Sequence, residues 1–206
     1  DHAHQMGIIH RDIKPSNLMV ESVVSGQLSV FSDGQLTADN GQRTSPKLFI
    51  TDFGLARIET DATLTLTGDL LGTLRYMSPE QAEGRTAILD HRTDIYSLGI
   101  TLYELLTLRP AFPATDRQTL VQQIANDEPP PPRKLNQAIP AEFETVVLKA
   151  ASKDRADRYQ SARALADDLR RWLDSKPILA RPPSGWQRVA KWSRRNSTVL
   201  ATWSAV

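Results

Sequence analysis

The sequence has no cysteine, so it can form neither disulfide bonds nor zinc sites with thiolate ligands. It also lacks an excess of either charge: 25 Lys and Arg face 24 Asp and Glu, and the formal net charge is +1. A chain so balanced has no overall field that would attract nucleic acid, and we expect no nucleic-acid partner. What is present, 206 residues of which 40% are hydrophobic and 24% charged, predicts one globular domain with a sizeable core.

The hydrophobic pattern changes from strand-like to helical along the chain. Short apolar runs rich in β-branched residues occur between Ile8 and Ile50, and a polar segment at about 25–45 interrupts them. This pattern predicts a few short strands joined by a long loop. After about residue 90 apolar residues recur every three or four positions, which predicts helices at about 90–109, 115–127, 140–150 and 161–173, with Pro140 in the first turn of the third and Ser161 as the cap of the fourth. The first is expected to be a core helix whose apolar residues are Ile95, Leu98, Leu102, Leu105 and Leu106. The expected fold class is therefore α+β and mainly α, with a small β element followed by a helical body.

The stretch IIHRDIKPSNLMV, residues 8–20, combines His, Arg, Asp, Lys and Asn with an apolar frame. Charged side chains are costly to bury unless each has a partner. Two interpretations fit these residues: a solvated loop between two short apolar strands, or a catalytic loop.

A second stretch, LFITDFGLAR at residues 48–57, places Asp52 at the end of an apolar run and directly before Phe53 and Gly54. Glycine permits unusual backbone angles, so the carboxylate could be held in the geometry of a metal ligand. A plain turn explains the tripeptide equally well. Two further motifs follow in the chain, GTLRYMSPEQA at residues 72–82 and DIYSLG at residues 94–99.

The motifs HRDIKPSN, DFG, GTLRYMSPE and DIYSLG, in this order, resemble the C-terminal lobe of a eukaryotic-like serine/threonine protein kinase of the bacterial type. The resemblance covers about residues 1–173. It implies that residues 1–175 are the C-terminal lobe of a catalytic domain, with a loop insertion at about 25–45, and that the chain begins inside the helix that precedes the catalytic loop. The N-terminal lobe would then be absent, and we expect the isolated chain to be inactive.

The resemblance implies ATP and Mg²⁺ as cofactors and proteins with Ser or Thr as substrates. Asp12 matches the catalytic carboxylate that accepts the proton of the substrate hydroxyl, and Lys14 matches the lysine that meets the γ-phosphate. Asn17 and Asp52 match the oxygen ligands of Mg²⁺, which also makes them part of the nucleotide site. Met19 matches the residue beneath the adenine ring.

Other matched positions have supporting roles by resemblance. Thr73 is expected to bridge Asp12 and Lys14 and to favour Ser or Thr acceptors. His10 and Phe53 are expected to pack and hold the loop, with Gly54 beside Phe53. The resemblance also implies a Glu80–Arg158 pair, an Asp94 side chain that braces the catalytic loop backbone, and activating phosphorylation at Thr65 and Thr67, whose phosphates would pair with Arg11 and Arg57.

Two other functions remain as alternatives at this point. Small-molecule phosphotransferases of the aminoglycoside kind have a related His-x-Asp-x-x-x-x-Asn loop, but Lys14 is typical of serine/threonine protein kinases. A pseudokinase or scaffold would bind partners without turnover. The intact catalytic-loop positions weigh against it for the parent protein.

The tail at residues 176–206 differs in character from the rest of the chain. Its GWQRVAKWSRR segment mixes tryptophan with cations, and the uncharged residues 196–206 follow. Tryptophan and basic residues favour the membrane boundary, but these eleven residues fall short of the roughly twenty that span a bilayer. We expect a juxtamembrane tail at the possible start of a transmembrane helix, in a single-pass membrane protein whose kinase region is cytoplasmic. A basic helix lying on the membrane surface or on the lobe is the alternative.

Overall fold

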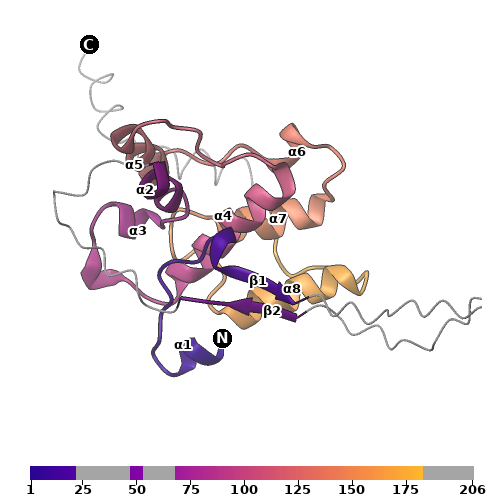
Figure 1. Ribbon diagram of the computed structural model, residues 1–206. Coiled ribbons are helices and arrows are strands. Elements are labelled where there is room, and N and C mark those ends of the chain that lie inside the picture. The colour runs from indigo at the N-terminus through magenta and orange to yellow at the C-terminus, as the bar shows by residue number, and fades with distance from the viewer. Residues whose placement is uncertain (22–46, 53–67, 183–206) are drawn as a thin grey trace, which may run out of the picture.

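The computed structural model describes residues 1–21, 47–52 and 68–182 (Figure 1). The described part is mostly helical, with one small two-stranded sheet, and confirms the expected mixture of elements. The elements in chain order are α1 (His2–Gln5), η1 (Pro15–Asn17), β1 (Leu18–Glu21), β2 (Lys47–Ile50), α2 (Gly68–Leu74), α3 (Pro79–Ala82), η2 (Thr86–Ile88), α4 (Arg92–Thr107), α5 (Arg117–Asn126), α6 (Pro132–Leu135), α7 (Ala141–Ala150) and α8 (Ala162–Leu173).

The sheet consists of β1 and β2, which pair antiparallel with Leu18 opposite Ile50 and Glu21 opposite Lys47. The pairing continues one step beyond the sheet, because the Thr51 N–H donates to the Asn17 carbonyl oxygen at 3.0 Å. The ends of the two strands are thus fixed side by side. The predicted insertion at 25–45 lies outside the described residues.

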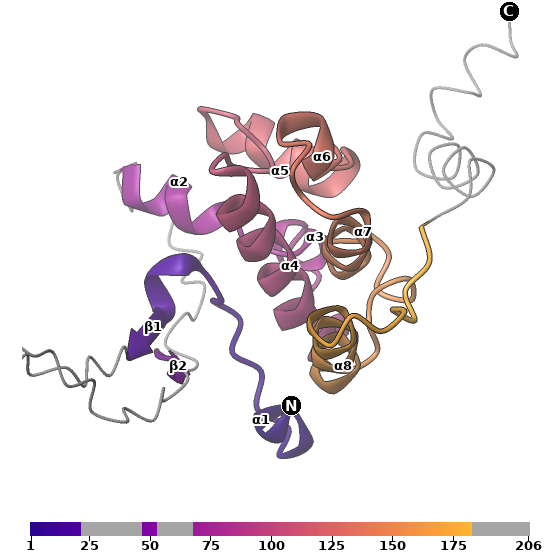
Figure 2. The same cartoon turned by 90° about the vertical axis from the view of Figure 1, so that its right-hand side faces the viewer.

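Helix α4 is the centre of the helical body. It contacts α6, α7 and α8, and Figure 2 shows the sheet on one side of it and α7 and α8 on the other. Tyr96, Ile100 and Tyr103 belong to one core cluster, whereas Ile95 belongs to a second one. Because α4 is covered on several sides, it does not have the single apolar stripe that the leucine spacing suggested. Leu105, expected on that stripe, is 54% exposed.

Gly99 allows α4 and α7 to pack closely. A Cβ atom at this position would lie 2.8 Å from Ala150 Cβ and 2.9 Å from the Ala151 backbone nitrogen. Real Cβ atoms do not approach other atoms so closely, so this crossing requires glycine.

The structure bears out the predicted helix starts after residue 115 and after Ser161. Asp116 caps α5 by accepting from the Thr119 N–H at 2.9 Å, and Ser161 caps α8 by accepting from the Ala164 N–H at 3.1 Å. Pro140, expected in the first turn of its helix, is instead the residue just before α7. Helix α1 lies where the resemblance implied a helix before the catalytic loop, whereas the short helices α2, α3 and α6 were not predicted.

The chain continues to pack against α8 after that helix ends. The buried Asp168 carboxylate accepts from the Tyr159 hydroxyl at 2.9 Å and from the N–H groups of Leu179 and Ala180 at 2.7 and 2.9 Å. Burial, followed by this bond to Asp168, raises the pKa of Tyr159. Asp168 therefore fixes the path of residues 179–180 on the body.

None of the helices in the described ranges has the length and apolar composition needed to cross a membrane. The tail segment from which we expect a transmembrane helix, residues 196–206, falls outside those ranges.

Candidate active site

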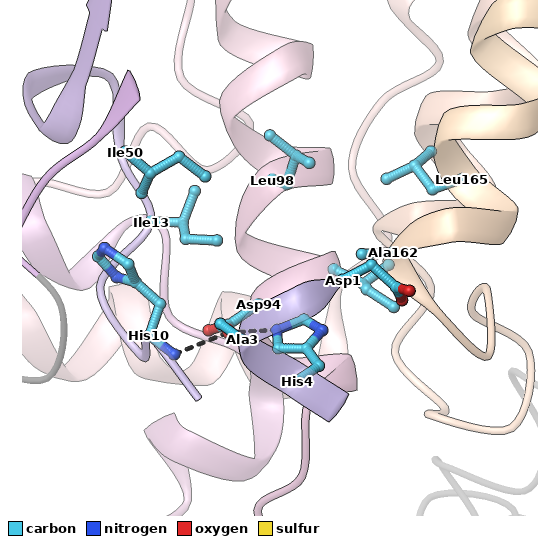
Figure 3. Close-up of a pocket in the computed structure, with 11 residues that line it drawn as sticks. Asp1, Ala3, His4, His10, Ile13, Ile50, Asp94, Leu98, Ala162 and Leu165 are labelled. Atoms are coloured by element: carbon cyan, nitrogen blue, oxygen red, sulfur yellow. Dashed lines mark hydrogen bonds and ion pairs between the residues drawn. The ribbon is translucent and has the colours of Figure 1, made fainter. Parts of the chain in front are cut away.

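The backbone of the catalytic loop is held by Asp94, in the first turn of α4. The buried Asp94 carboxylate accepts from the Arg11 N–H at 2.7 Å through Oδ1 and from the His10 N–H at 2.8 Å through Oδ2. The same Oδ2 lies 2.8 Å from Nε2 of His4 (Figure 3). Arg11 has φ 68°, a left-handed backbone conformation that is uncommon for residues other than glycine. The bonds to Asp94 stabilise this conformation and so orient the next residue, Asp12.

His10 and Gln81 support the loop from two other directions. The buried His10 ring is 2.8 Å from the Thr51 carbonyl oxygen through Nε2 and accepts from the Asp12 N–H at 3.3 Å through Nδ1. These partners assign the proton to Nε2. Gln81 of α3 donates from Nε2 to the Arg11 carbonyl oxygen at 3.0 Å. The loop is thus tied to β2, α3 and α4 together.

The loop and the start of α4 also enclose an apolar pocket behind the catalytic residues. Figure 3 shows Ile13, Ile50, Leu98 and Leu165 around it, with His4 and His10 at its lower edge. The pocket lies on the side of Asp94 and α8, whereas the carboxylate of Asp12 is part of another group of side chains.

Asp12, Lys14, Asn17 and Thr73 form one hydrogen-bonded cluster. Lys14 Nζ lies 3.0 Å from Asp12 Oδ2 and donates to Thr73 Oγ1 at 3.0 Å. Asn17 Nδ2 donates to the Asp12 carbonyl oxygen at 2.9 Å and to Asp12 Oδ2 at 3.0 Å. Lys14 therefore bridges Asp12 and Thr73, whereas Thr73 was expected to bridge Asp12 and Lys14.

This cluster leaves the Asp12 carboxylate with one engaged and one available oxygen. Both side-chain bonds go to Oδ2, and since Oδ1 has no hydrogen bond from any described residue, it can accept one from an incoming hydroxyl. The Asp12 side chain is 16% exposed, so it is accessible yet mostly shielded from water. A fixed, partly desolvated carboxylate of this kind can orient a hydroxyl and accept its proton.

Asn17 and Asp52 offer oxygen ligands at the adjoining ends of the two strands. Because Asn17 Nδ2 is bound to Asp12, its Oδ1 faces the other way, and among the described residues it accepts one bond, from the Ser16 hydroxyl at 3.4 Å. Asp52 is exposed just beyond β2 and has φ 62°. An amide oxygen and a carboxylate fit Mg²⁺, which takes few protein ligands and completes its shell with phosphate and water oxygens. Within the described residues, no group of three or more His, Asp or Glu could hold a metal.

Met19 lies on an exposed apolar face of the sheet. It is opposite Phe49, and the two side chains are 58% and 48% exposed. Directly paired residues point to the same face of an antiparallel sheet. Met19 and Phe49 therefore form an exposed apolar pair on one face of the sheet, with the Glu21–Lys47 pair two positions further along the same face.

Glu80 and Arg158 form a buried ion pair. Both Glu80 oxygens accept from the Arg158 guanidinium at 2.7 Å, and Oε1 also accepts from the Thr93 hydroxyl at 2.9 Å. Burial alone would raise the pKa of Glu80, but the hydrogen bonds and charge of Arg158 outweigh it and lower the pKa. The pair joins α3, which carries Gln81, to the segment before α8.

Several predicted residues cannot be placed in this arrangement. Phe53, Gly54, Arg57, Thr65 and Thr67 lie outside the described residues. Conversely, sequence reasoning missed His4 and Gln81. Gln81 had a local signal, because Ser78 and Gln81 form a capping box at the start of α3. Nothing in the sequence around His4 indicates its contact with Asp94.

Comparison with known proteins agrees with this geometry. Residues 1–169 match the family model described as the protein kinase domain. The chain is 37% identical over 187 residues, 90% of its length, to a probable serine/threonine-protein kinase of Streptomyces coelicolor. It is 37% identical over 176 residues, 85% of its length, to serine/threonine-protein kinase PknB of Mycobacterium leprae. A probable serine/threonine-protein kinase of Clostridium perfringens is 36% identical over 169 residues, 81% of this chain.

The chain thus belongs to the protein kinase domain family, and the relatives named above are bacterial serine/threonine-protein kinases. It spans 24% of the length of the Streptomyces and Mycobacterium proteins and 21% of the Clostridium protein.

Proposed function

We propose that this chain forms the catalytic-loop part of a protein kinase that transfers the γ-phosphoryl group of ATP to serine or threonine hydroxyls of proteins in signalling. The observation that carries the proposal is the Asp12 cluster: one carboxylate oxygen bound by Lys14 and Asn17, the other open, and the backbone fixed by Asp94. Phosphoryl transfer needs mainly this kind of positioning and charge stabilisation.

In this mechanism Asp12 Oδ1 accepts the hydrogen bond of the substrate hydroxyl and aligns its oxygen with the γ-phosphorus. As the oxygen–phosphorus bond forms and the bond to the ADP oxygen breaks, the hydroxyl proton passes to Asp12. Lys14, held between Asp12 and Thr73, is close enough to stabilise negative charge on the moving phosphoryl group. Asn17 Oδ1 and the Asp52 carboxylate would hold Mg²⁺, which when bound neutralises phosphate charge.

The direct test is transfer of label from γ-labelled ATP to protein by the full-length protein, with Mg²⁺ present. We expect label on serine or threonine and a loss of about 10²–10⁴-fold in rate for Asp12→Asn. Asp127→Asn, which changes an exposed carboxylate after α5, is the matched control and should transfer at the wild-type rate. A protein that binds ATP but transfers no label would be a scaffold or pseudokinase instead.

The 206-residue chain alone should be inactive. It contains no glycine-rich phosphate loop of the G-x-G-x-x-G pattern, and half of the expected nucleotide site depends on such a loop. Turnover by the purified chain that depends on Asp12 would contradict this part of the proposal.

Activation by phosphorylation at Thr65 and Thr67 also belongs to the proposal. The phosphates would pair with Arg11 and Arg57 through charge-assisted hydrogen bonds. The Arg11 position supports this idea, because that residue directly precedes Asp12 and its backbone is already fixed by Asp94. Mass spectrometry of active enzyme should find phosphate on these threonines, and a fully active Thr65→Ala/Thr67→Ala variant would refute the switch.

For the tail we propose a transmembrane helix that begins near residue 196 in the full-length protein, with the kinase region on the cytoplasmic side. The support is the Trp-rich and Arg-rich segment before it. Alkaline carbonate should leave the full-length protein in the membrane fraction. Release by high salt would show a surface-bound helix in its place.

A further inference from the structure

Arg75 lies in the turn between α2 and α3, and the described residues give it no adequate partner. Its Nε is buried without any hydrogen bond, and its Nη2 makes one long bond of 3.5 Å to the Ala114 carbonyl oxygen. In the part of the chain that the structure describes, no Asp or Glu forms an ion pair with it. A partly buried guanidinium with an unmet donor is costly, and a carboxylate is the group that best satisfies it.

Nearby acidic side chains in the described part of the chain are engaged elsewhere. Glu104 accepts from the Tyr76 hydroxyl at 3.0 Å, and Asp116 caps α5 by accepting from the Thr119 N–H. Burial and the bond to Glu104 raise the pKa of Tyr76, so this hydroxyl keeps its proton and continues to donate. The unmet donor of Arg75 therefore points to an anion that the described residues do not supply.

Arg75 is also close to the reaction centre. It follows Thr73 by two residues, and Thr73 is joined through Lys14 to Asp12 by contacts of 3.0 Å each. Two residues span at most about 7 Å of chain. An extended substrate advances about 3.3 Å per residue. With its acceptor hydroxyl at Asp12, such a substrate can bring a residue one to three positions away to Arg75.

Helices α2 and α3 both pack against α5, and Ala114 lies in the loop that leads into α5 (Figure 1). The end of the Arg75 side chain thus lies where the turn between α2 and α3 meets that loop. The Arg75 side chain as a whole is only partly buried, but its Nε has no exposed surface, so a ligand from solvent can approach only the Nη end of the guanidinium.

We propose that Arg75 binds an acidic side chain of the protein substrate within three residues of the phosphorylated serine or threonine, and that the kinase therefore prefers acidic sequences. This inference rests on the proposed kinase function. The planar guanidinium can donate two parallel bonds to one carboxylate, a fit that an amide or a lysine cannot reproduce.

The test compares peptides that differ by one residue, Glu, Gln or Lys, at each position from three before to three after a single serine. Transfer and peptide binding by fluorescence anisotropy are both measured with the full-length protein. We expect the wild type to favour Glu over Gln about tenfold at one position in both readouts. Arg75→Gln should reduce that ratio to about one, and Arg75→Glu should favour the Lys peptide.

The matched control is Arg117→Gln, which removes an exposed cation at the start of α5 and should leave the preference for Glu intact. Equal handling of Glu and Gln peptides by the wild type at every position would overturn the inference, whether or not any variant folds. A wild-type preference that survives Arg75→Gln would overturn it too, as would a phosphate or carboxylate of this protein found bound to Arg75. If no peptide is phosphorylated, the kinase function fails, while the binding readout still decides the role of Arg75.

Discussion

Removing the negative charge of Glu80 should cost a large part of the stability of the domain. In Glu80→Gln the side chain keeps its size, but the Arg158 guanidinium loses its carboxylate partner while it remains fully buried. Three carbonyl oxygens, of Ser152, Arg92 and Lys153, still accept from Arg158 at 2.8–3.0 Å. They satisfy its hydrogens without neutralising its charge.

Breaking a buried ion pair from one side costs about 3–5 kcal/mol. For a protein of this size, 1 kcal/mol changes the melting temperature by about 2–4 °C. We therefore expect Glu80→Gln to lower the melting temperature by roughly 6–20 °C, measured by circular dichroism during heating. Urea unfolding should give the free-energy loss independently.

The control is Asp174→Asn, which breaks the Lys176–Asp174 pair at the surface. These side chains are 63% and 56% exposed, and such pairs contribute little in water. The double variant Glu80→Met/Arg158→Met should recover part of the loss, because it leaves no unpaired charge in the core. If Glu80→Gln lowers the melting temperature no more than Asp174→Asn does, the buried Glu80–Arg158 pair does not stabilise the domain as proposed.

Three further predictions follow from the fold and the loop. Gly99→Ala should destabilise the protein by about 1–3 kcal/mol in urea unfolding, because its Cβ would lie 2.8 Å from Ala150 Cβ; an unchanged midpoint would contradict the close crossing. Asp94→Asn should lower kcat for peptide phosphorylation by about 10²-fold, because the NH2 group that replaces one carboxylate oxygen cannot accept from a backbone N–H, so one of the two bonds to the loop is lost and Asp12 shifts. Wild-type kcat would show that these bonds are dispensable. The folded state lowers the pKa of Glu80, so the ionised carboxylate stabilises the protein above about pH 4.5, its ordinary pKa, and this stability is lost as the pH falls through the folded pKa. Urea unfolding measured at several pH values should therefore show a smaller loss of stability in acid for Glu80→Gln than for the wild type.

The resemblance to protein kinases predicted some of the contacts that hold the loop in place, and the structure shows two of them: the bonds of Asp94 to the loop backbone and the Glu80–Arg158 ion pair. Asp12, Asn17 and Asp52 are expected at the site through the same resemblance, and their roles stay predictions. The structure places Asn17 and Thr51 next to each other through the strand pairing. Contacts between segments far apart in the chain, such as His4 with Asp94, have no local pattern from which they could be predicted.

Helix α4 shows a second limit of sequence patterns. A single apolar stripe can be predicted only where a helix has one buried face. In α4 the polar residues Ser97 and Thr101 are also buried, because their hydroxyls donate to backbone carbonyls one turn earlier at 3.2 and 2.8 Å. Buried Ser and Thr residues of this kind do not appear in a hydrophobicity pattern, so the pattern cannot show which faces of the helix are buried. The prediction that Leu105 lies in the core was wrong.

We expect Asp12 to act on the acceptor hydroxyl and Asp52 to act on the nucleotide through Mg²⁺. One experiment separates the two roles: calorimetric binding of ATP, with and without Mg²⁺, to full-length Asp12→Asn and Asp52→Asn, alongside phosphoryl transfer by the same samples. The account predicts that Asp12→Asn binds MgATP as the wild type does but transfers at least about 10²-fold more slowly, whereas Asp52→Asn loses the Mg²⁺-dependent part of binding as well. Transfer by Asp12→Asn at the wild-type rate would contradict the claim.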